Sequence, residues 1–231
     1  MNKSFVIAGI SSIILSFGIG WAYGFKKIPP STKFANLLKG NTNNYETFRE
    51  KARYQHFELS IPNPDVVFLG GGITQAAVFN EALETSARIY NRGARGDTAF
   101  DILNRLQEIK KLNPKVVYLM VGMNDLHRGA SPKQISENIS KIHDSLTKSG
   151  IKIIVQETIQ CQPSKCSYKN EVNELNKLLA SLFKSDLLQL GELSSTNGLD
   201  GNLTSDGVHL NKEGYAAWIN ILRKTQSNYL Q

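Results

Sequence analysis

From residue 65 to the C-terminus, short apolar segments alternate with amphipathic segments, and this alternation constrains the fold more than any other feature of the sequence. The apolar segments are predicted strands, at residues 65–70, 86–93, 115–122, 151–158 and 187–193. The amphipathic segments are predicted helices, at residues 97–113, 131–150, 170–186 and 211–226. Because strands that are apolar throughout are buried on both faces, the pattern predicts an α/β fold with a five-stranded parallel sheet covered by helices on both sides.

The N-terminal segment, residues 4–25, carries no charged side chain and is mostly apolar. A helix of about 20 such residues spans the core of a bilayer. We therefore expect an N-terminal transmembrane helix that stays as a single-pass membrane anchor; cleavage as a signal peptide, followed by secretion, is the alternative. The predicted organisation is an anchor or signal sequence at residues 1–27, a linker with an amphipathic helix at residues 28–60, and a domain at residues 61–231.

Cys161 and Cys166 are the only two cysteines, and both lie in the segment CQPSKC. Their spacing permits a small disulfide ring, which would place the domain in an oxidising compartment outside the cytoplasmic membrane. The lysines that follow the apolar segment favour the opposite orientation by the positive-inside rule, and a reduced cytosolic pair is the alternative. The net charge of +7 fits an anionic lipid or an acidic polymer, and no dense basic run with interleaved aromatic residues indicates nucleic acid.

Polar segments follow the first three predicted strands, at the edge where parallel sheets bind their ligands, and another precedes the last predicted helix. They are GGGIT at residues 70–74, NRGARGDT at 91–98, VGMNDL at 121–126 and TSDGVHLNKEGY at 204–215. Asp206 and His209 have the residue types of a carboxylate that orients a histidine base. Gly96 offers a backbone N–H and Asn124 a side-chain amide, and both kinds of donor build oxyanion holes. A nucleophile is expected on the first corner, which consists of glycine.

The chain resembles the SGNH or GDSL hydrolases from about residue 64 to the C-terminus, and reads FLGGGIT where that family reads FLGDSIT. The branch it resembles is similar to platelet-activating-factor acetylhydrolase subunits and bacterial carbohydrate O-acetylesterases. The resemblance implies a flavodoxin-like three-layer fold and hydrolysis of acyl or acetyl esters of a glycan or lipid. It also implies catalytic His209 and Asp206, oxyanion-hole donors at Gly72, Gly96 and Asn124, and the nucleophilic serine position at Gly72.

The departure from the family motif concerns both residues of its Asp-Ser pair, which are Gly71 and Gly72 in this chain. Glycine has no hydroxyl and cannot form an acyl-enzyme. Three interpretations stay open: an ester hydrolase by descent that has lost its nucleophile, a pseudoenzyme that binds an acylated glycan or lipid, and an altered version of an active esterase. Thr74 is expected to point away from the site, whereas Ser205 is a candidate substitute, and water activated by His209 would give slow turnover.

Several other residues invite a structural interpretation. Asp125 is expected to brace the loop after the third strand, and Tyr215 and Trp218 are expected in the core. Asn91 and Arg92 fit a structural role as well as a role in the site. The four histidines are dispersed and lack the spacing of metal ligands, so we expect no metal and no other cofactor.

Removing residues 1–27 is expected to release a soluble, folded domain, because the apolar surface of that segment serves the bilayer and not the core. The full-length chain should sediment with membranes, and the truncated chain should stay in the supernatant and unfold cooperatively on heating. Aggregation of the truncated chain would instead assign the segment to the folded domain.

Overall fold

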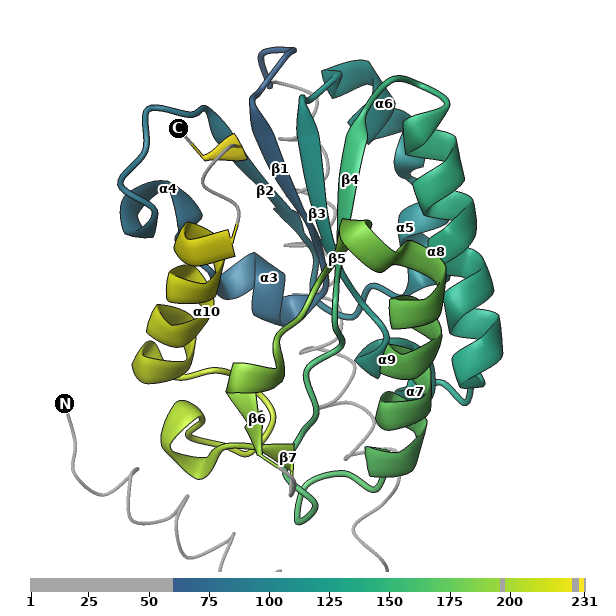
Figure 1. Ribbon diagram of the computed structural model, residues 1–231, viewed down its shortest axis with the longest axis vertical. Helices are drawn as coiled ribbons and strands as arrows, with labels where there is room; N and C mark the ends of the chain where they lie inside the picture. The colour runs from purple at the N-terminus through teal and green to yellow at the C-terminus, as the bar shows by residue number, and fades with distance from the viewer. Residues whose placement is uncertain (1–59, 196–197, 226–228, 231) are drawn as a thin grey trace, which may run out of the picture. The chain divides into compact units, whose positions relative to one another are not determined.

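The computed structural model describes residues 60–195, 198–225 and 229–230 of the chain (Figure 1). Its main sheet has five parallel strands in the order β2-β1-β3-β4-β5, which is the flavodoxin-like order. Its strands are β1 Val66–Gly70, β2 Ile89–Gly93, β3 Val116–Met120, β4 Lys152–Gln156 and β5 Leu187–Leu188. A small antiparallel pair, β6 Ser194–Ser195 and β7 Gly198–Leu199, lies after β5. The predicted α/β class and the five parallel strands are confirmed.

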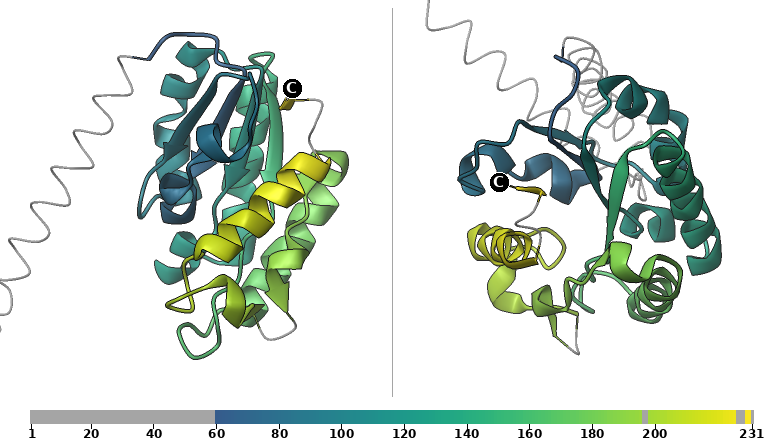
Figure 2. Two further views of the ribbon diagram at one scale, coloured as in Figure 1. Left: turned by 90° about the vertical axis from the view of Figure 1, so that its left-hand side faces the viewer. Right: turned by 45° about the horizontal axis from the view of Figure 1, so that its top comes forward.

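Helices form one layer on each face of this sheet, as the view along the sheet in Figure 2 shows. The first layer consists of α3 Gly72–Ala76, α4 Phe79–Ala82 and α10 Lys212–Thr225. The second consists of α5 Ala99–Asn104, α6 Leu106–Leu112, α8 Pro132–Thr147 and α9 Lys169–Phe183. Shorter elements lie between them: α7 Met123–His127 and the 3₁₀ turns η1 Lys184–Asp186, η2 Gly191–Leu193 and η3 Gly201–Leu203.

Alternate residues of the central strands pack against the two layers. In β1, Val67 and Leu69 join the core beneath α5, α6, α8 and α9, whereas Val66 and Phe68 join the core beneath α4 and α10. Trp218 of α10 is fully buried in the second core, and its indole N–H donates to Gln156 Oε1 at 2.8 Å. Because both faces of the sheet are covered, the central strands β1 and β3 are buried at every position.

Two helices begin at residues whose side chains cap them. Thr98 precedes α5 and forms a capping box with Asp101, and Ser131 precedes α8 and forms one with Gln134. These side chains satisfy backbone N–H groups that a helix leaves unpaired in its first turn. The expected helix start near residue 131 is therefore explained by its cap.

The single helix predicted at residues 97–113 is wrong, because the structure has two helices, α5 and α6, on either side of Arg105. Arg105 has φ −102° and ψ 12°, outside helical values. Its guanidinium bonds the Asp97 carboxylate at 2.8 Å and the Arg92 carbonyl at 2.7 Å. Arg105 thus contacts residues that precede α5, at the point where α5 and α6 separate. The spacing of apolar residues along the sequence does not reveal these contacts.

The predicted membrane anchor and the amphipathic linker helix lie outside the described residues. Within residues 60–195, 198–225 and 229–230, no helix combines the length and the apolar character that crossing a bilayer requires.

Asp125 ties α7 to the start of α5, since its carboxylate accepts the Ala99 N–H at 2.9 Å; this agrees with the bracing role predicted for it. Burial raises the pKa of Asp125 to about 6, although the Ala99 N–H lowers it. The folded pKa therefore exceeds the unfolded value of about 3.9. The contribution of Asp125 to the free energy of unfolding is therefore fully present below about pH 4. It is lost as the pH rises through about 6, and the total loss is up to about 3 kcal/mol.

Asp125→Asn keeps an oxygen that can accept the Ala99 N–H and removes the titration. We expect the free energy of unfolding of the unaltered chain, relative to that of the variant, to fall between pH 4 and pH 7. Urea unfolding at several pH values measures this difference. Identical pH slopes for the two proteins would contradict the assignment.

Candidate active site

A cleft of about 210 Å³ lies at the carboxyl ends of β1, β3 and β4. Four of the five predicted site residues border it or its floor: Gly72, Gly96, Asn124 and His209. The fifth, Asp206, is bonded to His209. Apolar side chains make up most of the remaining lining, among them Ile73, Met120, Val121, Met123 and Ile159. The topology thus gathers residues from distant parts of the chain at one edge of the sheet, where such folds bind ligands.

The three glycines of the first corner, Gly70, Gly71 and Gly72, differ in the space available for a side chain. A Cβ on Gly70 would lie 2.4 Å from Thr74 Oγ1 and 2.5 Å from the Met120 carbonyl oxygen, so only glycine fits there. A Cβ on Gly71 would lie 3.0 Å from Asn124 Nδ2, and a Cβ on Gly72 would lie 3.7 Å from Arg95 Cγ. Gly71 has φ −87°, and Gly72 is the first residue of α3, so neither needs the left-handed region. The fold therefore requires glycine at position 70 alone of these three.

The donors predicted for an oxyanion hole lie on the loops after β1, β2 and β3. Gly72 is in the first turn of α3, where backbone N–H groups lack an intrahelical acceptor. Gly96 has φ +85°. Its carbonyl oxygen accepts a hydrogen bond from the Arg128 guanidinium at 2.8 Å, and this bond fixes the orientation of the peptide that follows Gly96. Asn124 Nδ2 donates to the Asp97 carbonyl at 2.9 Å, and this amide nitrogen carries a second N–H.

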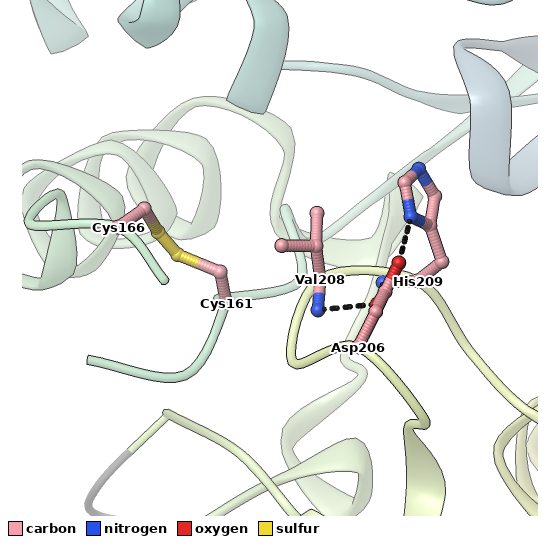
Figure 3. The surroundings of a disulfide bond; sticks show 5 residues. All are labelled: Cys161, Cys166, Asp206, Val208 and His209. Carbon is pink, nitrogen blue, oxygen red and sulfur yellow. Dashed lines mark hydrogen bonds and ion pairs between the residues drawn. A yellow bond between two sulfur atoms is a disulfide. The ribbon is translucent and has the colours of Figure 1, made fainter. Parts of the chain in front are cut away.

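Asp206 and His209 form the bonded pair predicted from the sequence (Figure 3). His209 Nδ1 lies 2.8 Å from Asp206 Oδ2. Asp206 Oδ1 accepts the backbone N–H groups of His209 at 2.8 Å and Val208 at 2.9 Å. The His209 backbone N–H, then the His209 ring and the Val208 N–H, hold the pKa of Asp206 well below its usual range. An ionised Asp206 orients the imidazole so that Nε2 is the nitrogen left for proton transfer.

Other hydroxyls do not replace the missing serine in this geometry. Thr74 is buried, as expected for a side chain that points away from the site, and Ser205 is exposed and outside the residues that line the cleft. Thr158 does line the cleft, but its hydroxyl donates to the Val121 carbonyl at 2.6 Å. Thr158 and Cys161 also border the cleft and were not predicted there, although Thr158 ends the predicted fourth strand and Cys161 follows it, so the strand-end rule applies to both.

The remaining polar candidates have structural contacts. Asn91 Nδ2 donates to the carbonyls of Thr74 at 2.7 Å and Ala77 at 2.9 Å, so it ends α3. Arg92 is buried and pairs with Glu108 at 2.9 Å. The part of the chain that the structure describes contains no group of three His, Cys, Asp or Glu side chains that could hold a metal.

Comparison with known proteins identifies a matching family and solved structures of similar fold. The model of the GDSL-like Lipase/Acylhydrolase family matches residues 68–217. An N-acylneuraminate cytidylyltransferase of Streptococcus agalactiae serotype V is 24% identical over 139 residues, which cover 58% of this chain and 34% of that protein. The chain thus spans about a third of the length of the curated relatives it matches.

Solved structures share the fold. A candidate platelet activating factor from Streptococcus pneumonia has a TM-score of 0.72 and 21% identity, covering 86% of this chain and 99% of that one. The acetyl xylan esterase AlAXEase has a TM-score of 0.61 and 22% identity, covering 70% of this chain and 98% of that one.

Gly70→Ala and Gly72→Ala form a matched pair that tests at which of the two positions packing requires glycine. The first should destabilise the domain by about 1–3 kcal/mol, because its Cβ meets a backbone oxygen that cannot move aside. The second should be neutral or stabilise by up to about 1 kcal/mol, because alanine is a better helix residue than glycine. Thermal unfolding of both variants measures the difference, and equal losses would contradict it.

Proposed function

Because the chain belongs to the GDSL-like lipase and acylhydrolase family over residues 68–217, we propose that its cleft holds a short acyl ester of a glycan or lipid. The cleft does so without forming an acyl-enzyme. The observation that carries this proposal is the Asp206–His209 pair, bonded at 2.8 Å beside a cleft that Gly72, Gly96 and Asn124 also line. The base and the donors are present, and the corner between them lacks a hydroxyl.

With a serine at position 72, the chemistry would be that of an acyl transfer. His209 would accept the serine proton as the Oγ–carbon bond forms, and the donors would stabilise the oxyanion. His209 would then give the proton to the leaving alcohol as the ester carbon–oxygen bond breaks. With Gly72 in place, the same groups can still orient and polarise the ester carbonyl, which makes the cleft a binding site.

Slow hydrolysis by water is the second candidate. The Asp206 carboxylate orients His209 as it would in a complete triad, so His209 Nε2 can take a proton from a water that attacks the carbonyl. This route lacks a positioned nucleophile and is expected to be slow.

Two observations support a small acyl group on a glycan. The cleft is small and mostly apolar, which suits an acetyl or another short acyl chain. Among the similar proteins, one is described as an acetyl xylan esterase and another by its action on an N-acylneuraminate. Arg95, which also borders the cleft, would favour an ester whose alcohol carries a negative charge.

The proposed location is outside the cytoplasmic membrane, with residues 4–25 as the anchor. The disulfide between Cys161 and Cys166 supports this location, since such bonds persist in oxidising compartments. The anchor itself is inferred from the apolar sequence.

The double substitution Gly71→Asp with Gly72→Ser is expected to install hydrolysis of p-nitrophenyl acetate, at least about 10³-fold above the unaltered chain. The reason is that removal of the serine from a comparable triad lowers kcat by about 10⁶-fold in subtilisin. Gly72→Ser alone should recover less, because an aspartate at position 71 would fix the corner beside the Asn124 amide. Initial rates of p-nitrophenol release measure the gain.

Two controls accompany this experiment. Adding His209→Ala should remove the gain, and Gly191→Ser, which puts a hydroxyl in open space outside the cleft, should produce none. A folded double variant that stays inert would show that the donors and base no longer form a working site. Activity of the unaltered chain that depends on His209 would mean that water or another side chain serves as the nucleophile, and Ser205 would be the first hydroxyl to replace.

A further inference from the structure

The Asp206–His209 pair has little packing to hold it in place. Its side chains are 54% and 55% exposed, so the core does not fix their orientation. Within residues 204–210, which we call the pair loop, Thr204 provides an internal tie: its hydroxyl donates to the His209 carbonyl at 2.6 Å and accepts the Gly207 N–H at 2.9 Å. These bonds shape the loop but do not place it over the cleft.

A second loop contacts the pair loop. It consists of residues 162–165, enclosed by the Cys161–Cys166 disulfide, and we call it the disulfide loop. The Gln162 N–H donates to the Gly207 carbonyl at 2.7 Å, and Gly207 lies between Asp206 and His209 in the sequence. Figure 3 shows the disulfide and the bonded pair in the same region of the molecule.

The fit between the two loops depends on glycine at position 207. Gly207 has φ +82°, and a Cβ there would lie 2.5 Å from Lys165 Cγ and 2.9 Å from Gln162 Oε1. The disulfide loop therefore packs directly against the backbone of the pair loop. A displacement of either loop is transmitted to the other through this contact and the Gln162–Gly207 hydrogen bond.

The disulfide loop is itself anchored. Cys161 follows Thr158, whose backbone is bonded to the Asn176 amide of α9 at 2.9 and 3.0 Å. The Cys161 carbonyl packs on Gly198, where a Cβ would lie 2.4 Å from its oxygen. Inside the loop, the N–H groups of Lys165 and Cys166 donate to the Gln162 carbonyl at 2.9 and 3.2 Å. The disulfide closes this turn and holds the Gln162 N–H toward Gly207.

We propose that Cys161 and Cys166 are positioning residues for the candidate base: their disulfide holds Gly207 in place, which keeps His209 bonded to Asp206 and facing the cleft. This inference rests on the proposed function for the role of His209, but not for the geometry of the two loops. Neither sulfur takes part in the chemistry. The site is then complete only where the disulfide forms, which links its competence to an oxidising compartment.

The first test follows the Asp206 carboxyl by NMR in the full-length chain with ¹³C-labelled aspartate carboxyls, with Asp206→Asn to assign its signal. The bonds from His209 and Val208 keep the pKa of Asp206 low. In Cys161→Ser/Cys166→Ser, the midpoint of Asp206 should rise toward the ordinary carboxyl value of about 3.9. A folded double variant with an unchanged midpoint would overturn the proposal, since a purely stabilising disulfide would leave this midpoint where it is.

A second variant keeps the disulfide and disturbs the contact. Gly207→Ala should raise the Asp206 midpoint in the same way, because its Cβ collides with Lys165. The matched control is Gly150→Ala: Gly150 has φ +78° and nothing within 4 Å of a Cβ, so it brings a similar backbone strain without the collision. The Asp206 midpoint should stay unchanged in the control. The proposal would be contradicted if both substitutions shifted the Asp206 midpoint equally, or if neither shifted it.

The third test is kinetic and uses the Gly71→Asp/Gly72→Ser background. Loss of the disulfide or Gly207→Ala should lower kcat by about tenfold or more and change KM by less than about twofold, because a misplaced base affects the chemical step. Gly150→Ala should leave both values unchanged. If the background itself is inert, the base and the donors do not form a hydrolytic site, and the Asp206 titration still decides the role of the disulfide. A kcat unaffected by loss of the disulfide would overturn the proposal.

Discussion

The parallel register of three strands is the constraint on which the rest of the site depends. β1 lies between β2 and β3, and Gly70 is level with Gly93 on one side and with Met120 on the other. The loops that follow these residues therefore leave the sheet at the same height and bring Gly72, Gly96 and Asn124 to one cleft. Glycine at positions 70 and 93 lets α3 lie directly across the strand ends, since a Cβ on Gly93 would lie 2.3 Å from the Gln75 nitrogen.

The other half of the site is held differently. Asp206 and His209 come from a loop before α10 and not from a strand end, and their orientation depends on hydrogen bonds between exposed groups. α10 is well anchored, because Trp218 is buried and the Tyr215 hydroxyl donates to the Ile73 carbonyl of α3 at 2.9 Å. The helix thus fixes where the loop ends, and the contact with the disulfide loop at Gly207 acts on its middle.

The fold and most of the site could be predicted because they depend on local signals. Apolar strands with helices between them indicate a parallel sheet, and the strand-end rule leads to Gly96 and Asn124. What could not be predicted depends on contacts between distant segments. The ion pair from Arg105 to Asp97 accompanies the break between α5 and α6, and no periodicity reports it. The pairing of Cys161 with Cys166 follows from their spacing, whereas the contact of Gln162 with Gly207 does not.

The glycines at the strand ends separate what the fold needs from what the chemistry needs, and the sequence alone does not make this distinction. A Cβ would lie only 2.4, 2.3 and 2.5 Å from the nearest atom at Gly70, Gly93 and Gly122, respectively. Close packing therefore explains glycine at these three positions. Packing does not account for Gly72, where the nearest atom would be at 3.7 Å, and it leaves room at Gly71 if the Asn124 amide shifts slightly. The scaffold would therefore accept a serine at position 72. The absence of a hydroxyl there changes which reaction the cleft can perform and leaves the packing that shapes the cleft as it is.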